Sequence, residues 1–588
     1  MKNPAWLVIA LGALLGACAQ QPLTPDAGDA PQRTAAQPKA KVAAKPARPQ
    51  LPAQELTEQF MLKLMLAEVA VQRGQPHVAV PAYLELARET RDPRVAQRAT
   101  EVAWNARFID SAIEAAGIWL QADPQSQQAR QVLAALLVNQ AQLSTVLPHL
   151  ETWLKSDPAN VGQSFLQITS LLARHKDKNA VLALMQGLAR GYGEVPEARF
   201  AVAQAAWNAE NVELALSEVR EALRLRPDWE LAAIFQAQVL QRQSAADAVG
   251  YLASYLEKHP RAKDARLTYA RLLVSEKKFP EARKQFEVLL AEHPDNPEVT
   301  MAVALLAMQL KDYDAAEAQL KRALEINYRD PDTVRIYLGQ VNEERQRYDE
   351  ALEWYGSISS GEQHLSARLR YAGVLAKQGR LADARKHLQA ITPRNTQQQV
   401  QLTQAEAQLL RESSAYQEAF DLLGQALDKY PDYPELLYDH AMAAEKVNRI
   451  DILEKNLRKL ISLRPDHAHA HNALGYTFAD RNERLDEARE LIETALKLAP
   501  EDPFIMDSMG WVLYRQGQLP QALDYLKRAH ALRPDPEIAA HLGEVLWVSG
   551  KRDEARAVWD ESLKSHPTNE VLQSTVNRFL RTNRPAAR

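Results

Sequence analysis

The 588-residue chain is short of the residues on which many functional sites depend. It contains 21 glycines, against roughly 7% of residues in average proteins, and only 7% of its residues are aromatic. These shortages argue against extended sheets and nucleotide-binding loops. Its one cysteine cannot form an internal disulfide or a thiolate-based zinc site. With 71 basic and 75 acidic side chains, the net charge of −4 excludes the basic surface that a nucleic-acid partner requires.

Catalytic and cofactor motifs are also missing. The sequence has no Walker loop, Rossmann glycine fingerprint, HExxH motif or GxSxG nucleophile elbow. His467 and His471, with His469 between them, are one helical turn apart and have the spacing of a metal pair, but they open a predicted helix where solvated polar residues are ordinary. We therefore expect no catalytic residue, metal, cofactor or small-molecule substrate, and the chain is predicted not to be an enzyme.

The N-terminus has the features of an exported lipoprotein. Residues 5–17 form an apolar run with the length of a signal-peptide core, too short to span a bilayer. The segment Leu15-Gly16-Ala17-Cys18 resembles the bacterial lipobox, which implies lipidation of Cys18 after removal of the signal peptide, residues 1–17. The alternative is that Cys18 is an ordinary small residue in a secretion signal.

The residues after Cys18 predict where the protein lies. An aspartate directly after the lipidated cysteine retains such lipoproteins in the inner membrane; Ala19 stands here instead, which implies anchoring in the outer membrane with the body facing the periplasm. Residues 18–54 are rich in proline and alanine and have almost no large apolar side chains, so we expect a disordered tether.

Small residues recur at a regular interval through the rest of the chain. Prolines form one series, and alanines form a second series in the same register, with Leu453 in place of one alanine. In both series the step between neighbours is about 34 residues or a multiple of it. The prolines are Pro124, Pro158, Pro227, Pro260, Pro294, Pro431, Pro465, Pro500, Pro534 and Pro567. The alanines are Ala215, Ala248, Ala282, Ala316, Ala351, Ala384, Ala419, Ala488, Ala522 and Ala555.

The C-terminal copies indicate how each repeat folds. Gly510 and Gly543 lie where two helices are expected to approach too closely for a side chain, whereas Gly517 and Gly550 permit a turn. Ala522 and its equivalents would let the second helix of each pair pack tightly. The pattern is similar to that of tetratricopeptide repeats, in which a helix, a turn and a second helix form the unit.

That resemblance implies an all-α fold. Residues 55–582 are predicted to form about 15 helical pairs stacked in a right-handed superhelix, followed by a tail over 583–588. The first helices of such a stack line a concave groove, which offers binding rather than catalysis. An enzyme with a tetratricopeptide arm would need a separate domain of about a hundred residues, and the repeats leave no such gap.

The first predicted helix is unusually apolar. In residues 60–71 only Lys63 and Glu68 interrupt the apolar side chains, although the ends of helical stacks normally carry a polar face. We interpret this segment as a docking helix for a partner protein, with contact residues Phe60, Met61, Leu64 and Met65. The alternative is that it packs on its own helical pair and the preceding linker covers the remainder.

A second candidate surface is a band of aromatic and polar residues near the C-terminus. Aromatic anchors beside polar groups are typical of protein-recognition hot spots. Counted from the Leu-Gly positions, the candidate groove residues are Asn472, Tyr476, Asp507, Trp511, Tyr514, Arg515 and Trp547. The alternative is that these rings fill gaps between successive repeats.

Two segments carry a more specific resemblance, residues 472–480 (NALGYTFAD) and 507–514 (DSMGWVLY). With the lipobox and the tether, they make the chain similar to outer-membrane lipoprotein adaptors of periplasmic carboxyl-terminal processing proteases in pseudomonads. The resemblance implies that the protein binds such a protease together with client peptidoglycan cross-link hydrolases and promotes client proteolysis. A scaffold for a pilus, secretin or exopolysaccharide machine would use the same anchor and groove and stays open as an alternative.

Overall fold

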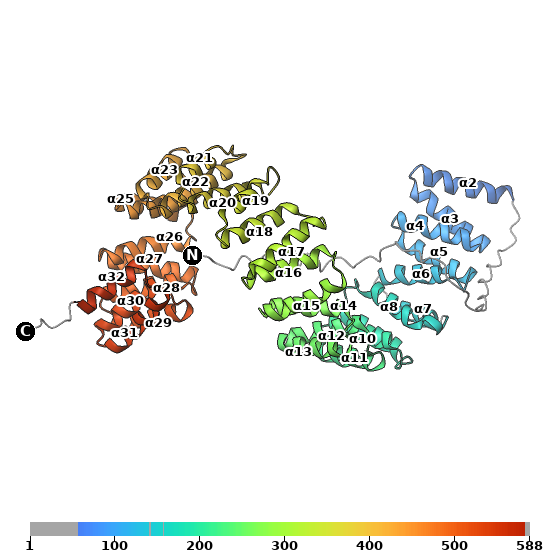
Figure 1. The fold of residues 1–588 in the computed structure, drawn as a ribbon. Coiled ribbons are helices and arrows are strands. Elements are labelled where there is room, and N and C mark those ends of the chain that lie inside the picture. The colour runs from blue at the N-terminus through green and yellow to red at the C-terminus, as the bar shows by residue number, and fades with distance from the viewer. Residues whose placement is uncertain (1–56, 140–142, 157, 582–588) are drawn as a thin grey trace, which may run out of the picture. The chain divides into compact units, whose positions relative to one another are not determined.

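The computed structural model describes residues 57–139, 143–156 and 158–581, and across these ranges every regular element is a helix. The predicted signal peptide, Cys18, the tether and the tail over 583–588 lie outside the described residues. Contacts divide the chain into an N-terminal unit ending at Tyr328 and a C-terminal unit starting at Arg329 (Figure 1). None of the helices in the described ranges combines the length and apolarity needed to cross a membrane.

The N-terminal unit is a series of helical hairpins. Its helices are α2 (Glu58–Gln72), α3 (Pro76–Thr90), α4 (Pro93–Asn105), α5 (Ile109–Ala122), α6 (Gln127–Asn139), α7 (Leu143–Ser156), the 3₁₀ helix η2 (Pro158–Asn160), α8 (Val161–Leu172), α9 (Lys178–Ala189), α10 (Pro196–Asn208), α11 (Val212–Leu225), α12 (Glu230–Gln243), α13 (Ala245–Lys258), α14 (Lys263–Ser275), α15 (Phe279–Glu292), α16 (Pro297–Gln309) and α17 (Tyr313–Glu325).

The C-terminal unit continues the pattern and ends with a single helix after the last hairpin. Its helices are α18 (Pro331–Glu344), α19 (Tyr348–Gly356), α20 (His364–Lys377), α21 (Leu381–Gln389), α22 (Thr396–Glu412), α23 (Tyr416–Lys429), α24 (Pro434–Lys446), α25 (Ile450–Leu463), α26 (Ala468–Asp480), α27 (Leu485–Leu498), α28 (Pro503–Arg515), α29 (Leu519–Leu532), α30 (Pro536–Val548), α31 (Arg552–Ser565) and α32 (Glu570–Arg581).

The two residue series mark fixed places in each hairpin, which confirms the repeat register. Every proline of the series lies two residues beyond the last residue of a second helix, where it cannot extend the helix. Every alanine of the series, and Leu453, lies on a second helix and is completely buried. The chain therefore folds as the predicted all-α tetratricopeptide solenoid.

Glycines permit close helix approach in several repeats. A Cβ placed on Gly510 would lie 2.5 Å from Leu526 Cγ, and one on Gly543 would lie 2.0 Å from Trp559 Nε1. Both distances are far below van der Waals contact, so a side chain at either position would overpack the hairpin. The predicted close contacts at these two glycines are confirmed.

The turns between paired helices depend less on glycine than the sequence indicates. Gly517 and Gly550 adopt left-handed backbone conformations, with φ of +80° and +82°. In other repeats Lys277, Lys311 and Gln346 hold the same turn with φ of 58° to 61°. Because non-glycine residues tolerate this conformation at a modest cost, the solenoid needs few glycines.

Candidate partner-binding surfaces

Helix α2 is the first described helix, and one of its faces packs against the core of the N-terminal unit. Ala67 and Ala70 are buried on this face, and Phe60 and Leu64 are partly buried against the same hydrophobic cluster. These four residues follow a helical spacing along one side of α2, so the hairpin with α3 defines which side of α2 faces inward.

The two charged residues inside the apolar segment also face the neighbouring helices. Lys63 Nζ lies 2.8 Å from Glu85 Oε1 and 2.6 Å from Glu89 Oε1 on α3. The hydroxyl of Tyr83 donates to Glu68, and this bond lowers the pKa of the Glu68 carboxyl, while burial raises the pKa of Tyr83 to about 12. Lys63 and Glu68 are thus engaged in contacts within the first hairpins.

The outward side of α2 is an apolar stripe. Its five large side chains are between 40% and 70% exposed, and they follow the i, i+3, i+4, i+7 spacing of one helix face. The α2 stripe consists of Met61, Leu62, Met65, Leu66 and Val69. An amphipathic surface helix normally turns its polar side to water, whereas the outward side of α2 is apolar like its inward side.

The structure separates the four predicted docking residues. Met61 and Met65 belong to the exposed stripe, whereas Phe60 and Leu64 face the core. Sequence analysis did not select Leu62 and Leu66, the most exposed leucines of the stripe. The positions of the buried Ala67 and Ala70, three residues apart, are the signal that defines the inner face.

The second predicted surface lies on the first helices α26, α28 and α30 of the C-terminal unit. His541 on α30 donates through Nδ1 to Asp507 Oδ2 on α28 at 2.8 Å. Its Nε2 lies 3.5 Å from Tyr476 Oη on α26, and its ring stacks on Trp511 with centroids 4.2 Å apart. His541 therefore joins three successive repeats through one buried ring.

The charge on His541 is governed by opposing effects. Burial alone would lower the pKa of its imidazole, but the neighbouring carboxylates of Asp507 and Glu544 outweigh burial, and the pKa of His541 is raised above its ordinary value. Glu544 also accepts from Tyr514 Oη at 3.2 Å and from the guanidinium of Arg578 on α32. The acidic residues thus favour a charged imidazolium in the interior.

Several predicted groove residues belong to this interior instead of the surface. Trp511 is 5% exposed and Trp547 is 7% exposed, and Asp507 is buried as well. Trp547 packs on Trp559 and Phe579, with ring centroids 5.7 and 6.2 Å apart. Trp511 and Trp547 therefore fill space between helices, and the Asp507 side chain is buried there too.

The remaining four predicted residues are half-buried and reach the surface. We define the C-terminal first-helix face by these residues, Asn472, Tyr476, Tyr514 and Arg515. Several polar atoms here are buried without a hydrogen-bond partner among the described residues. Two of them, Asn472 Oδ1 and Arg515 Nε, belong to residues of the face, and the other two, Asp507 Oδ1 and Trp511 Nε1, belong to buried residues next to it. Buried unpaired polar atoms are costly, so the hydrogen bonding of this face is incomplete in the chain alone.

His541 and Glu544 are central to this network, and neither is among the residues predicted from the sequence. The repeat register contained a signal for Glu544, because it follows Gly543 as Trp511 follows Gly510 and Tyr476 follows Gly475. His541 precedes its Leu-Gly pair, where no aromatic residue drew attention. Its role appears only when α28 and α30 are side by side.

The histidines near residue 470 have structural roles. His467 Nδ1 accepts from the backbone nitrogen of Ala470 at 3.1 Å and caps α26. His471 Nε2 lies 3.0 Å from the carbonyl oxygen of Pro465. Across the described ranges, no group of three or more His, Cys, Asp or Glu side chains is arranged to hold a metal ion.

Comparison with known proteins supports the repeat assignment. Models described as tetratricopeptide repeat match residues 239–306, 276–332, 438–503 and 508–570. The chain is 32% identical over 592 aligned residues to the TPR repeat-containing protein PA4667 of Pseudomonas aeruginosa, covering 99% of this chain and 97% of that protein.

Two partial likenesses are weaker. The human protein O-mannosyl-transferase TMTC1 is 25% identical over 171 residues, covering 28% of this chain and 19% of that protein. A thermophilic TPR protein of Thermus thermophilus, known as a crystal structure, is 25% identical and covers 31% of this chain and 98% of its own, with a TM-score of 0.29. From the full-length relative, this chain belongs to the tetratricopeptide-repeat family, whose members bind protein partners.

Proposed function

We propose that this chain is an adaptor, anchored in the outer membrane through Cys18 and facing the periplasm. It would bind a carboxyl-terminal processing protease and its client cell-wall cross-link hydrolases together and so promote client proteolysis. The observation that carries this proposal is the α2 stripe, an exposed apolar surface on a helix whose Lys63 and Glu68 pair with neighbouring helices. The lipobox at Cys18 supports the membrane anchor.

The α2 stripe suits a folded partner with an apolar surface of its own. Its side chains are medium-sized or flexible, and two of them are methionines, which adapt to a partner's shape. An amphipathic helix laid against an apolar groove is a recurrent mode of protein recognition. We therefore assign the α2 stripe to the protease.

The C-terminal first-helix face suits an extended peptide segment. On this face Asn472 Oδ1 is an unpaired acceptor and Arg515 Nε is an unpaired donor, and both residues are half-buried. A peptide backbone both donates and accepts, so small side-chain rotations toward a bound chain would satisfy these atoms. We assign this face to clients. Holding protease and client on one chain raises their effective concentration without any catalytic residue in the adaptor.

The test is affinity purification of the tagged lipoprotein from solubilised envelopes, followed by mass spectrometry. The docking variant is Leu62→Glu with Leu66→Glu, which places charge on the stripe without touching the core. The matched control, Leu231→Glu with Val288→Glu, adds the same charge at exposed apolar positions of the same unit. We expect the docking variant to lose the protease and keep the hydrolases, and the control to keep both.

The size of the effect can be checked with purified components. Two leucines that become buried on binding contribute about 1.5 kcal/mol each, so the docking variant should bind the protease roughly 100-fold more weakly. Recovery of neither a protease nor a wall hydrolase with the unaltered chain would contradict the adaptor proposal. Recovery of pilus, secretin or exopolysaccharide components would favour the envelope scaffold instead.

A further inference from the structure

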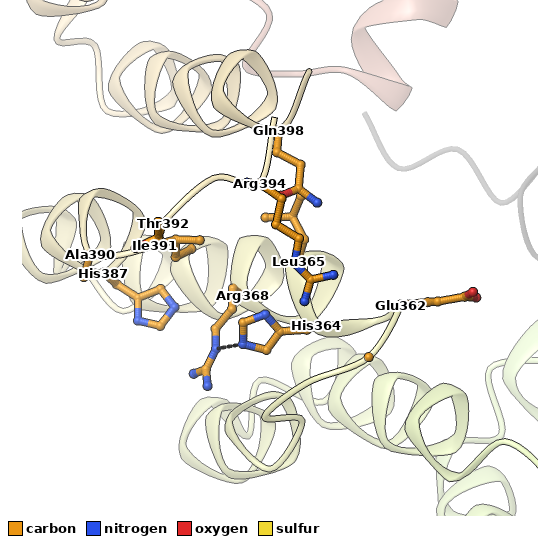
Figure 2. Close-up of a pocket in the computed structure, with 11 residues that line it drawn as sticks. Glu362, His364, Leu365, Arg368, His387, Ala390, Ile391, Thr392, Arg394 and Gln398 are labelled. Atoms are coloured by element: carbon orange, nitrogen blue, oxygen red, sulfur yellow. Dashed lines mark hydrogen bonds between the residues drawn. The ribbon is translucent and has the colours of Figure 1, made fainter. Parts of the chain in front are cut away.

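A basic pocket lies in the C-terminal unit, and none of the residues that line it belongs to either partner-binding surface. It has a volume of about 630 Å³ and is bounded by the start of α20, the end of α21 and the connection leading to α22. Figure 2 shows Arg368 and His364 from α20 and Arg394 from the connection lying close together, with His387 of α21 beside them. Four basic side chains thus line one cavity.

The positive charge in this pocket is not balanced. Within the described part of the chain, neither Arg368 nor Arg394 forms an ion pair with a carboxylate, whereas Arg385 nearby contacts both Glu406 and Glu418. Glu362 is the only acidic residue among those lining the pocket, and its side chain points away from the arginines (Figure 2). Clustered cations without counter-charges repel one another, which a bound anion would relieve.

The two histidines are held in the neutral form by this environment. Burial lowers the pKa of His364, and the charges of Arg368 and Arg394 lower it further; burial and Arg368 act in the same way on His387. Arg368 Nε donates to His364 Nε2 at 3.2 Å, so that nitrogen carries no proton. His387 Nε2 is buried and has no hydrogen-bond partner in the described residues.

One part of the lining is apolar. The side chains of Leu365, Ala390 and Ile391 line the pocket together with the basic residues, so the pocket wall has both polar and apolar parts. We propose that this pocket is a binding site for a small organic anion, in which a phosphate or carboxylate group contacts Arg368 and Arg394 and an aliphatic portion lies against Leu365 and Ile391. This site is independent of the proposed adaptor function, since it includes no residue of either partner-binding surface.

Titration calorimetry of the full chain at low salt tests the site with three probes. Inorganic phosphate supplies charge alone, whereas butyl phosphate and butyrate each add an aliphatic chain and distinguish a phosphate from a carboxylate. We expect one of the butyl compounds to bind more tightly than inorganic phosphate. Arg368→Gln and Arg394→Gln should each weaken binding about 10- to 100-fold, the usual contribution of a charge-assisted hydrogen bond.

The control is Arg449→Gln, which removes an exposed arginine of the same unit that pairs only locally with Asp451. It should leave binding unchanged, and thermal melting by circular dichroism verifies that each variant is folded. Binding should also take up protons, because an anion beside His364 and His387 favours their charged forms; repeating the titration in buffers of different ionisation enthalpy measures this uptake. Failure of all three probes to bind at millimolar concentration, or equal binding by the arginine variants, would overturn the proposal.

Discussion

Replacing Asp507 by asparagine should loosen the C-terminal repeats in a pH-dependent way. The substitution keeps the shape of the side chain but removes the charge that lies 2.8 Å from His541 Nδ1. At that distance two unit charges attract by about 6 kcal/mol if the effective dielectric constant is about 20. Burial of both groups offsets part of this attraction, and removing one partner of a buried pair costs about 3 kcal/mol.

The sign of the pH dependence follows from the raised pKa of His541. In the folded chain the pKa lies above the ordinary value of 6.5, so the proton binds the folded state more tightly than the unfolded state. The resulting stability is fully present below pH 6.5 and is lost as the pH rises through the folded pKa. The difference between the parent chain and Asp507→Asn should therefore be largest at about pH 6 and shrink in alkaline solution.

Hydrogen exchange followed by mass spectrometry measures the local stability of each helix. A local measurement is needed because a long repeat protein need not unfold in one step. Peptides from α28 and α30 should exchange faster in Asp507→Asn at low pH, after correction for the intrinsic exchange rate. Peptides from α10 and α11, in the other unit, serve as the internal control. A protection loss of equal size at pH 6 and in alkaline solution would refute a charged His541–Asp507 pair.

Four further substitutions test the helix packing and one turn by thermal melting. Gly543→Ala should destabilise the chain by about 1 to 3 kcal/mol, because the added Cβ would meet the completely buried Trp559. Gly373→Ala has no heavy atom within 4 Å of the added Cβ, so it should stabilise α20 by about 0.5 to 1 kcal/mol. Ala522→Leu should cost about 1 to 3 kcal/mol, and an unchanged melting temperature would contradict the assigned register. Lys311→Gly should stabilise its turn by about 0.5 to 1 kcal/mol, since glycine removes the strain of φ +61°; a loss of stability would show that the lost side chain matters more.

The repeat architecture could be predicted from the sequence because the same packing requirement recurs from one repeat to the next. A completely buried alanine on a second helix and a proline after its end recur wherever the hairpin packs in the same way. Turns are less predictable, because Lys311 and Gln346 adopt the left-handed conformation that Gly517 adopts elsewhere. Because a lysine or glutamine can hold that conformation at a cost of about 1 to 2 kcal/mol, a turn need not be marked by a glycine in the sequence.

The candidate site residues were harder to predict, because whether a side chain is exposed depends on a neighbouring repeat. Trp511 and Tyr514 lie less than one helical turn apart, yet the first is stacked under His541 and the second is half-buried. Likewise, the apolar run over 60–71 does not show which side of α2 faces α3. Only the packing of Ala67 and Ala70 determines that Leu62 and Leu66 are exposed.

The chemistry of the two partner-binding surfaces leads to one more prediction. The α2 stripe is purely apolar, so its contribution to binding should be insensitive to salt. The C-terminal first-helix face includes Arg515, and its neighbouring network contains Asp507 and Glu544, so binding of a charged peptide there should weaken as salt screens these groups. A salt series on the two binding reactions, with the purified protease and a client, should therefore change only client affinity. Equal salt dependence would mean that both partners use surfaces of the same chemical kind, and the assignment of the apolar stripe to one and the polar face to the other would fail.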